Sequence, residues 1–266
     1  MLRKYLIIAA FFSVMFSACE NSTEVDTELP YTEYTVINAE LSAGKVFDGV
    51  MITHTLPLGI AFDIKKAEIK DAVVYLLQDD IRVIPLHYTS DGLYNSISPF
   101  TVQEGSQYEL FAEIGNKSVY SKTVVPAMPE VVEATNAGNQ YLTALIKASP
   151  GVAYGAAWIV SAGGGGSSEK AAEFNSIETA DHFPSNVLVR TQNIPSPYNT
   201  PAYSNYLFIQ VYAFDKAYRD YFLTKTSSDP VSNTFTSGGG KVTWNVYGKD
   251  VIGLFIGMTE GGVYNP

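Results

Sequence analysis

Cys19 is the residue whose type and position indicate the most definite chemistry in this chain. It is the only cysteine, and it directly follows Ser17 and Ala18 at the end of an apolar segment that begins after Arg3 and Lys4. A positive start, an apolar segment and small residues before a cleavage point are typical of a secretory signal. A cysteine at this point makes the ending similar to a lipobox. The pattern predicts that the Cys19 sulfur receives a diacylglycerol, that the chain is cleaved before it and that the new N-terminus is acylated.

A lipid anchor fits this segment better than a transmembrane helix does. The apolar stretch is about a dozen residues long, whereas a spanning helix needs about 20. Several acyl chains, each contributing about 0.8 kcal/mol per buried methylene, would hold the protein firmly on a membrane. The alternative is an ordinary signal peptide with a coincidental cysteine, because Phe16 stands where a lipobox more often has leucine. We expect residues 1–18 to be the signal peptide of an outer-membrane lipoprotein, at the periplasmic face or on the cell surface.

The histidines show no spacing typical of catalysis or of a zinc site. A Ser-His-Asp arrangement needs a histidine that accepts the serine proton. His54 and His87 fall in predicted strands, His182 falls in a predicted loop, and there is no Gly-x-Ser-x-Gly elbow. Zinc usually takes three or four histidine, cysteine or carboxylate ligands at close spacing, which three scattered histidines do not supply. We therefore expect no catalytic histidine and no zinc.

The carboxylates are too numerous to indicate a site. Asp48, Asp79 and Asp80 could contribute to a calcium site, but the chain has no Asp-x-Asp-x-Asp-Gly loop. Twenty-seven acidic residues bring some carboxylate pairs together by chance, so a glycosidase-like pair cannot be singled out. We expect no metal, no cofactor and no enzymatic activity. A hydrolase with an unrecognised site is the alternative.

Aromatic side chains are the remaining candidates for ligand binding. Tyr198, Tyr203 and Tyr206 lie around a proline-rich stretch. Exposed rings of this kind stack on sugar faces or on apolar peptide, and loops carry binding residues more often than strands do. The alternative is that the three rings pack in the core. We take these tyrosines as the candidate ligand-binding residues.

Composition restricts the partners and the fold class. The net charge is −10, and it becomes −12 without Arg3 and Lys4, because 15 basic and 27 acidic residues then remain. A negative surface disfavours nucleic acid, because binding to a polyanion depends on lysine and arginine. One cysteine cannot form an intrachain disulfide. The 18 tyrosines and 14 phenylalanines favour β structure, so we predict a mainly all-β protein.

The first part of the mature chain is typical of a β-sandwich. Residues 19–32 are polar and acidic and are expected to form a tether. Strands are then expected at residues 34–41, 50–56, 72–77, 81–88, 108–114 and 118–125. Pro85 cannot donate to a ladder, so its strand should be an edge strand or be broken there. The spacing predicts an immunoglobulin-like sandwich of seven strands over residues 33–128.

Pro126 and Pro129 indicate a boundary, after which residues 129–266 are expected to form a second β-rich domain with one short helix. The helix is expected at residues 215–225, where Asp215 can cap its N-terminus and aromatic residues at 218, 221 and 222 share one face. Strands are expected at residues 141–147, 154–160, 186–191, 206–214, 241–248 and 251–258. Glycines in the last strand indicate a bulge or a close backbone approach.

These features, taken in order, resemble the Bacteroidota envelope lipoproteins of domain-of-unknown-function family 4249. The resemblance is carried by Cys19 and by short motifs at residues 36–42, 69–76, 91–94, 105–110, 218–222, 245–248 and 252–255. It spans nearly the whole mature chain. The first region also resembles immunoglobulin-like and carboxypeptidase-regulatory-like modules.

The resemblance implies a cell-envelope role but no activity or catalytic residue. Members of this family are regarded as companions of TonB-dependent outer-membrane receptors. We therefore expect a lipid-anchored, non-enzymatic accessory or binding protein that serves such a receptor or an uptake system. A carbohydrate- or peptide-binding module is the alternative.

Overall fold

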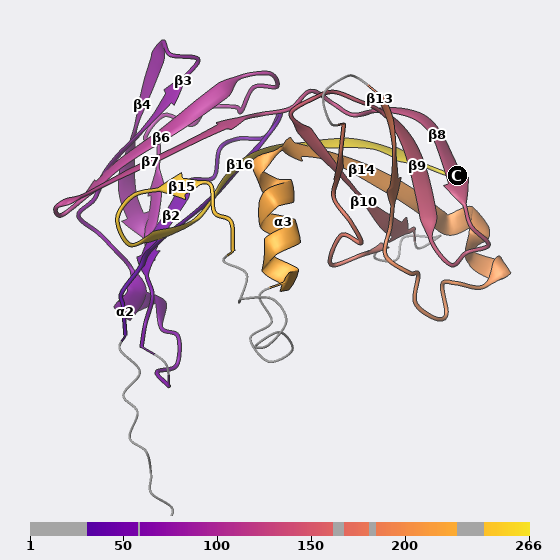
Figure 1. Ribbon diagram of the computed structural model, residues 1–266, viewed down its shortest axis with the longest axis horizontal. Helices are drawn as coiled ribbons and strands as arrows, with labels where there is room; N and C mark the ends of the chain where they lie inside the picture. Colours follow the sequence, from indigo (N-terminus) through magenta and orange to yellow (C-terminus); the bar gives the residue numbers. More distant parts are fainter. Residues whose placement is uncertain (1–30, 58, 162–167, 181–184, 228–241) are drawn as a thin grey trace, which may run out of the picture. The chain divides into compact units, whose positions relative to one another are not determined.

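Strands form most of the chain described by the computed structural model, which confirms the predicted all-β class (Figure 1). The structure describes residues 31–266 except 58, 162–167, 181–184 and 228–241. Residues from Glu33 to Pro266 form one compact unit. Cys19, the expected signal peptide and His182 lie outside the described residues. No helix in the described part is long and apolar enough to cross a membrane.

The first region contains seven strands in the described part of the chain, which is the number expected for residues 33–128, although the strand at Leu93–Asn95 is not among the expected ranges. They are β1 (Thr35–Ser42), β2 (Val50–His54), β3 (Val73–Gln78), β4 (Arg82–Ser90), β5 (Leu93–Asn95), β6 (Gln107–Ile114) and β7 (Lys117–Val124). A single helical turn, α2 (Ile64–Ala67), follows β2 and is capped by Asp63, which accepts a hydrogen bond from the Lys65 N–H.

Strand β4 links the strands on either side of it, β3 and β5. Its first half pairs with β3, and its second half pairs with β5. Pro85 lies in the first half, opposite Tyr75, where the pairing with β5 has not yet begun. A proline is tolerated there because one edge of the strand is free of ladder bonds. Contrary to the expectation from the sequence, the strand is neither broken at Pro85 nor at the edge of the sheet, but its side facing away from β3 is unpaired at this residue.

The second region consists of two packed sheets. The strands are β8 (Glu130–Asn136), β9 (Leu142–Ala148), β10 (Val152–Val160), β11 (Glu169–Lys170), β12 (Glu178–Thr179), β13 (Ser185–Arg190) and β14 (Leu207–Asp215), and a 3-10 helix, η1 (Pro201–Tyr206), precedes β14. Strands β13, β9 and β8 form a small sheet, while β10 and β14 belong to the large one. Alternate residues of β14, including Ile209 and Val211, are fully buried in the second core.

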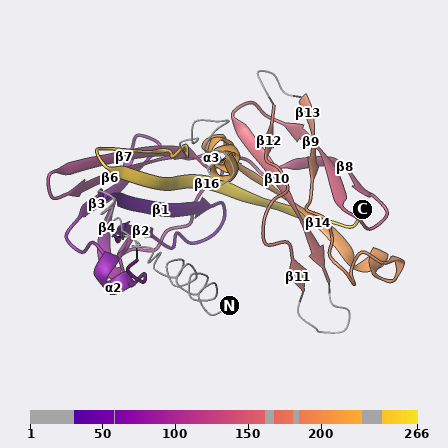
Figure 2. The ribbon, with the colours of Figure 1, turned by 60° about the horizontal axis from the view of Figure 1, so that its bottom comes forward.

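The C-terminal strand β16 (Val251–Tyr264) is shared by both regions and runs between β1 and β14 (Figure 2). It pairs in parallel with all of β1 and antiparallel with β14. Phe255 packs in the first core, whereas Met258 packs in the second. The sequence assigns residues 129–266 to one domain, but the chain returns to the first region, where β15 (Val246–Tyr247) also pairs with β7.

The glycines of β16 allow the close backbone approach that the sequence predicts. A Cβ at Gly253 would lie 1.8 Å from the Ile37 carbonyl oxygen, and the φ of this glycine is +139°. A Cβ at Gly257 would lie 2.5 Å from the Val124 carbonyl oxygen. The register with β14 shifts between Gln210 and Tyr212, which is the expected bulge. Glycine is therefore required where β16 crosses between the cores.

Helix α3 (Ala217–Ser227) confirms the predicted helix and packs beside the large sheet (Figure 1). Asp215 accepts a hydrogen bond from the Ala217 N–H at 2.9 Å through one carboxylate oxygen. Its other oxygen accepts from the Val124 N–H at 2.9 Å. Tyr218 and Phe222 face the second core, as the aromatic spacing predicts. Asp215 thus both caps the helix and ties it to the first region.

Two expectations about strands were incomplete. Strand β8 is not indicated by the sequence, because its residues are mostly polar and its register with β9 shifts near Glu133. The strand expected at residues 241–248 is reduced to β15. There the Asn245 side chain replaces ladder bonds, because it accepts from the Phe255 N–H and donates to the Phe255 carbonyl.

Candidate functional site

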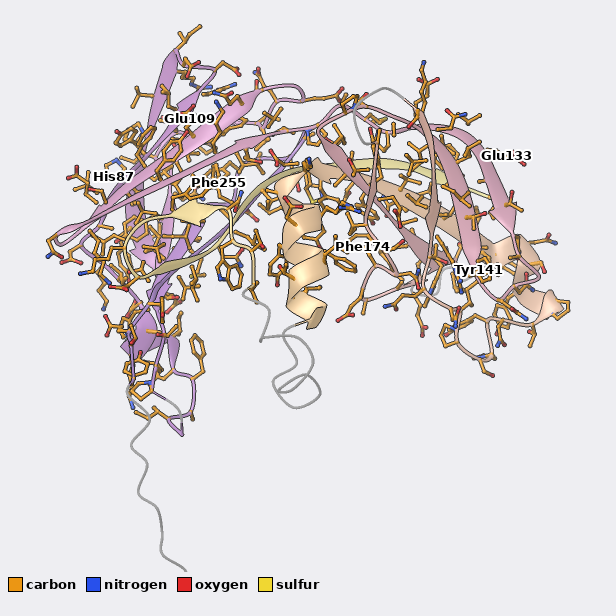
Figure 3. All side chains as sticks on the ribbon, viewed as in Figure 1. His87, Glu109, Glu133, Tyr141, Phe174 and Phe255 are labelled. Carbon is orange, nitrogen blue, oxygen red and sulfur yellow. The ribbon has the colours of Figure 1, made fainter. Side chains whose placement is uncertain are left out.

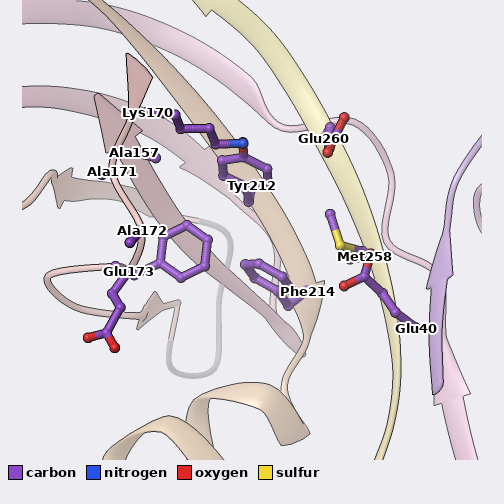
Figure 4. Close-up of a pocket in the computed structure, with 11 residues that line it drawn as sticks. Glu40, Ala157, Lys170, Ala171, Ala172, Glu173, Tyr212, Phe214, Met258 and Glu260 are labelled. Carbon is purple, nitrogen blue, oxygen red and sulfur yellow. The ribbon is translucent and has the colours of Figure 1, made fainter. Parts of the chain in front are cut away.

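A cavity of about 240 Å³ lies on the face of the large sheet beside α3 (Figure 4). We call it the Lys170 pocket. Its residues come from β1, β10, β11, β14, β16 and the segment after β11, and they are Glu40, Ala157, Lys170, Ala171, Ala172, Glu173, Phe174, Tyr212, Phe214, Met258 and Glu260. Both regions therefore contribute to one site, because β1 and β16 lie side by side in the same sheet.

The aromatic floor of the pocket is formed by side chains that alternate along β14 and by Phe174. Tyr212 and Phe214 are two residues apart on β14, so both point to the same face of the sheet. Phe174 contacts both rings, with centroid distances of 5.3 Å to Tyr212 and 5.5 Å to Phe214. Gly155 on β10 leaves room for Phe174, because a Cβ there would lie 2.9 Å from its ring. Figure 3 shows Phe174 in this region and Phe255 in the other.

Lys170 extends from the edge strand β11 over the aromatic floor. Its Nζ lies 4.5 Å from the centroid of the Tyr212 ring and contacts the Tyr212 hydroxyl. No ion pair within the described part of the chain involves Lys170. Burial lowers the pKa of Lys170, while Glu260 raises it and Lys45 lowers it. The site thus holds a partly desolvated ammonium group with a phenol and an aromatic face as its neighbours.

Tyr212 is protonated at neutral pH and donates a hydrogen bond. Its hydroxyl donates a hydrogen bond to the Gln210 side-chain oxygen at 2.5 Å. Burial, followed by the charges of Glu260 and Glu40, raises the pKa of Tyr212 well above its usual range. The phenol therefore stays protonated, because both its burial and the nearby carboxylates oppose a tyrosinate.

Two carboxylates lie across the sheet from Lys170 and have different partners. Glu260 forms an ion pair with Lys45 at 3.0 Å. Glu40 accepts a hydrogen bond from the Ser42 hydroxyl at 2.7 Å, and no ion pair in the described residues involves it. The negative charge of Glu260 is thus balanced within the protein, whereas that of Glu40 is open to a ligand.

Glu40 also lines two neighbouring cavities. One, of about 510 Å³, runs over β1 and β2 along Asn38 and Met51. The other, of about 120 Å³, includes Lys45 and Asp48. A ligand larger than the Lys170 pocket could therefore continue from Glu40 over the first region.

The tyrosines predicted as ligand-binding residues lie elsewhere. Tyr198 and Tyr203 form an edge-to-face pair with centroids 5.2 Å apart, and both pack against the second core. Tyr206 ends η1 and is 45% exposed. None of the three lines the Lys170 pocket. The structure brings Tyr198 and Tyr203 together as packing residues, and Tyr206 remains as an exposed ring.

The candidate metal ligands also serve local structure. Asp79 accepts hydrogen bonds from the Ser106 hydroxyl and the Gln107 N–H, both at 2.8 Å. His54 lies on β2 with its Nδ1 2.9 Å from the Thr55 carbonyl oxygen, and His87 is an exposed residue of β4. Within the described residues no group of three histidine, cysteine or carboxylate side chains is arranged for a metal ion.

The sequence offered little to identify the Lys170 pocket. Its residues are separated by up to 220 positions and lie on five strands and one connecting segment. The one local signal is the aromatic alternation of Phe208, Tyr212 and Phe214, which marks a second apolar face on β14. Lys170, on a strand of only two residues, has no such pattern around it.

Comparisons with known proteins do not identify a family. No family model matches the chain, and no curated protein matches it. Among solved structures, a DUF4785 family protein from Legionella pneumophila aligns over 67% of this chain and 51% of its own, at 10% identity and a TM-score of 0.25. The chain thus spans about half the length of that protein, and a TM-score this low does not establish a shared fold.

Proposed function

We propose that the protein is a lipid-anchored cell-envelope protein that binds a ligand for an outer-membrane receptor or uptake system without catalysing a reaction. A TonB-dependent receptor is the expected partner. The Lys170 pocket carries the proposal of binding, because its uncompensated charges lie on a face formed by a shared sheet. The Cys19 pattern supports the anchor.

The groups of the pocket favour binding over catalysis. Covalent catalysis needs a nucleophile hydrogen-bonded to a base. Tyr212 donates to a neutral amide oxygen, and Glu260 is held by Lys45. Lys170 contacts a phenol rather than a base. These side chains are therefore suited to hold and orient a ligand.

The tether gives such a binding protein reach. Residues 19–32 are rich in acidic and polar residues. At about 3.5 Å per extended residue, they would let the folded part move up to about 50 Å from a lipid anchor. This length suits a protein that passes a ligand to a neighbouring receptor in the same membrane.

The anchor is tested by mass spectrometry of the N-terminal peptide from protein purified out of its own envelope. We expect an acylated Cys19 as the first residue and a protein that sediments with membranes. The Cys19→Ser variant should be released into the soluble fraction. An unmodified Cys19 at an uncleaved or different N-terminus would contradict the proposal.

The partner is tested by photo-crosslinking in cells, with a photoreactive residue at Ala172, an exposed residue that lines the pocket. Ile97, which is 79% exposed in the first region, provides the control position. We expect a β-barrel receptor to be crosslinked from Ala172 and not from Ile97. Recovery of no membrane partner from either position would count against an accessory role.

Carbohydrate or peptide binding is the second candidate. The aromatic floor of Phe174, Tyr212 and Phe214, beside carboxylates, offers the stacking face and hydrogen-bond acceptors that a sugar ring needs. A glycan array probed with the purified protein distinguishes this reading. A specific hit that is lost in Phe174→Ala would favour it, and no hit would remove it.

A further inference from the structure

We propose that residues 59–67, which we call the α2 tip, dock on the membrane that holds the protein and insert Ile60 and Phe62 into the lipid interface. The inference rests on the proposed lipid anchor and adds the surface of the folded unit that faces the lipid. Its partner is a phospholipid bilayer, in which polar headgroups border an apolar acyl region.

The α2 tip exposes two large apolar side chains that lie close together in the sequence. Phe62 is 73% exposed, more than any other phenylalanine or tyrosine in the described part of the chain, and Ile60 is 50% exposed. The Ile60 N–H donates a hydrogen bond to the Pro57 carbonyl oxygen at 3.2 Å and closes a turn in the loop. Neither apolar side chain belongs to the first core. Both are therefore available to an apolar partner.

The α2 tip lies near the point where the expected tether joins the folded unit. The compact unit begins at Glu33, directly after residues 19–32. The Tyr34 N–H donates to the Thr55 hydroxyl at 3.1 Å, and the Tyr34 carbonyl oxygen accepts from the Thr55 N–H at 2.9 Å. The Glu33 carboxylate lies 3.7 Å from the His54 ring. Because the loop to the α2 tip starts at Thr55, the tip and the tether share one end of the first region.

The tether makes a weak contact sufficient for docking. Two inserted side chains would hold an unanchored protein on a membrane only weakly. A short flexible linker converts such a contact into an intramolecular one, at an effective concentration on the order of millimolar. The anchored protein is therefore expected to dock through side chains that would not bind it to the membrane from solution.

The charges of the α2 tip are compatible with phospholipid. The tip contains Lys65, Lys66 and one carboxylate, Asp63, so its formal charge is +1 in a chain of net charge −10. Lys65 Nζ lies 2.6 Å from an Asp91 carboxylate oxygen, and Asp63 accepts a hydrogen bond from the Lys65 N–H. Lys66 is exposed, and its long apolar stem lets the ammonium group stay at the level of the lipid phosphates. Docking thus needs no anionic lipid.

The opposite end of the first region provides an internal control. Ile81, in the turn between β3 and β4, is 86% exposed. Strand β4 runs from this turn toward the α2 tip, because Asp91 directly follows the strand and pairs with Lys65. Figure 1 shows the β3–β4 hairpin directed away from α2. Ile81 is therefore at least as exposed as Phe62 but lies away from the tether.

The inference is tested with the lipoprotein in phosphatidylcholine vesicles whose acyl chains carry bromine, which quenches tryptophan fluorescence at short range. Phe62→Trp places the reporter in the α2 tip, and Ile81→Trp is the matched control. The unmodified protein gives the background from Trp158 and Trp244. If Cys19 is found unmodified, the chain from residue 19 is coupled through its thiol to a maleimide lipid in the same vesicles.

We expect the fluorescence added by Phe62→Trp to fall by about half or more in brominated vesicles, and that added by Ile81→Trp to fall by less than about a tenth. Adding Ile60→Asp to Phe62→Trp should reduce the quenching at least about threefold, because a buried carboxylate opposes insertion. Adding Ile81→Asp instead should leave the quenching unchanged. Far-ultraviolet circular dichroism establishes that each variant is folded.

Equal quenching of the two reporters, or none for Phe62→Trp, would overturn the inference. A blue shift of the Phe62→Trp reporter without quenching, growing with protein density in the vesicles, would assign the α2 tip to a second copy of the chain and overturn it as well. An acylated Cys19 without quenching would leave the proposed anchor intact. Quenching in the maleimide-coupled chain, with Cys19 unmodified in cells, would support docking while the proposed anchor failed.

Discussion

The two regions of this protein differ in which faces of their strands carry apolar side chains. In the first region the inward residues of β1, β3 and β6 include the aliphatic side chains of Ile37, Leu76 and Leu110, all fully buried. In the second region β14 carries aliphatic residues on one face and the rings of Tyr212 and Phe214 on the other. The second region thus has a second apolar face, which helix α3 and the Lys170 pocket occupy.

This difference indicates that the first region is mainly a scaffold and that the second region provides most of the candidate site. The first region buries one face of its strands and contributes only Glu40 to the Lys170 pocket. The second region supplies the aromatic floor and Lys170. Because β16 pairs with β1 of the first region and with β14 of the second, the scaffold also fixes the position of Met258 and Glu260 in the site. The following predictions separate these roles.

The largest effect is expected from Gly253→Ala, which should destabilise both regions together. The new Cβ would meet the Ile37 carbonyl oxygen at 1.8 Å, and a non-glycine residue is strained at this positive φ. We expect a loss of about 4 kcal/mol or more in the free energy of unfolding, measured by denaturant titration.

Gly262→Ala is the control on the same strand. Its nearest neighbour would be the Tyr264 side chain at 3.1 Å, which can move. We expect a loss of about 1 kcal/mol or less. If Gly253→Ala were as mild as Gly262→Ala, β16 would not be the element that joins the regions.

Leu110→Ala should weaken the scaffold without changing the site. Leu110 is fully buried in the first core, and removing such a side chain leaves a cavity that costs about 2–5 kcal/mol. The dissociation constant of a ligand of the Lys170 pocket should stay within twofold at a temperature where the variant is folded. Val83→Ala, at a position 61% exposed on β4, should change stability by less than about 0.5 kcal/mol.

Gly155→Ala should have the reverse effect and disturb the site more than the scaffold. Its Cβ would lie 2.9 Å from the Phe174 ring and 2.8 Å from Ile177, and both side chains can shift. We expect a loss of about 1–3 kcal/mol in stability and at least a tenfold change in ligand affinity. An unchanged affinity, measured beside Leu110→Ala, would show that Phe174 does not form the wall of the site.

The smallest expected effects are opposite responses of the two regions to pH. Burial raises the pKa of Tyr218 in the second region to about 12. In the unfolded chain a tyrosine ionises near pH 10, so its contribution to stability is present below about pH 10 and is lost as pH rises toward 12. In the first region, hydrogen bonds from Tyr88 and then Lys70 lower the pKa of Glu68. Its contribution is present above the unfolded pKa of about 4.3 and is lost as pH falls through the lower folded value.

Thermal unfolding across the pH range measures both effects. Tyr218→Phe should reduce the loss of stability at alkaline pH and leave the acidic limb unchanged. Tyr88→Phe should reduce the loss of stability at acidic pH, and it should also change the alkaline limb, because the hydrogen bond to Glu68 and burial raise the pKa of Tyr88. A change in the acidic limb caused by Tyr218→Phe would argue that the two regions do not respond separately.

The fold was more predictable from the sequence than the site. Alternating strands, the turn residues and the Asp215 cap all act locally, so their patterns are visible in the chain. The return of β16 to β1 depends on parallel pairing between residues more than 200 positions apart, which no local pattern specifies. Glycines at 253 and 257 did indicate that another backbone approaches closely there.

The site was missed for a related reason. Tyr198 and Tyr203 lie in a proline-rich stretch that looks like a binding loop, and their partly buried rings contact each other and pack against the second core. Lys170 acquires its role only because β11 is placed at the edge of β10, two strands from Tyr212. Sequence predicts which faces of a strand are apolar, but not which distant charge will lie above them.

The most direct test of the division between scaffold and site is lysine acetylation followed by mass spectrometry, carried out on the unmodified protein and on Gly155→Ala and Leu110→Ala. Lys170 lines the pocket, and Lys122 on β7 lies in the first region. We predict that Gly155→Ala, which displaces Phe174, changes the acetylation rate of Lys170 at least fivefold and leaves that of Lys122 unchanged, whereas Leu110→Ala leaves the rate at Lys170 unchanged. An unchanged rate at Lys170 in Gly155→Ala, or an equal change at Lys170 in both variants, would contradict the account.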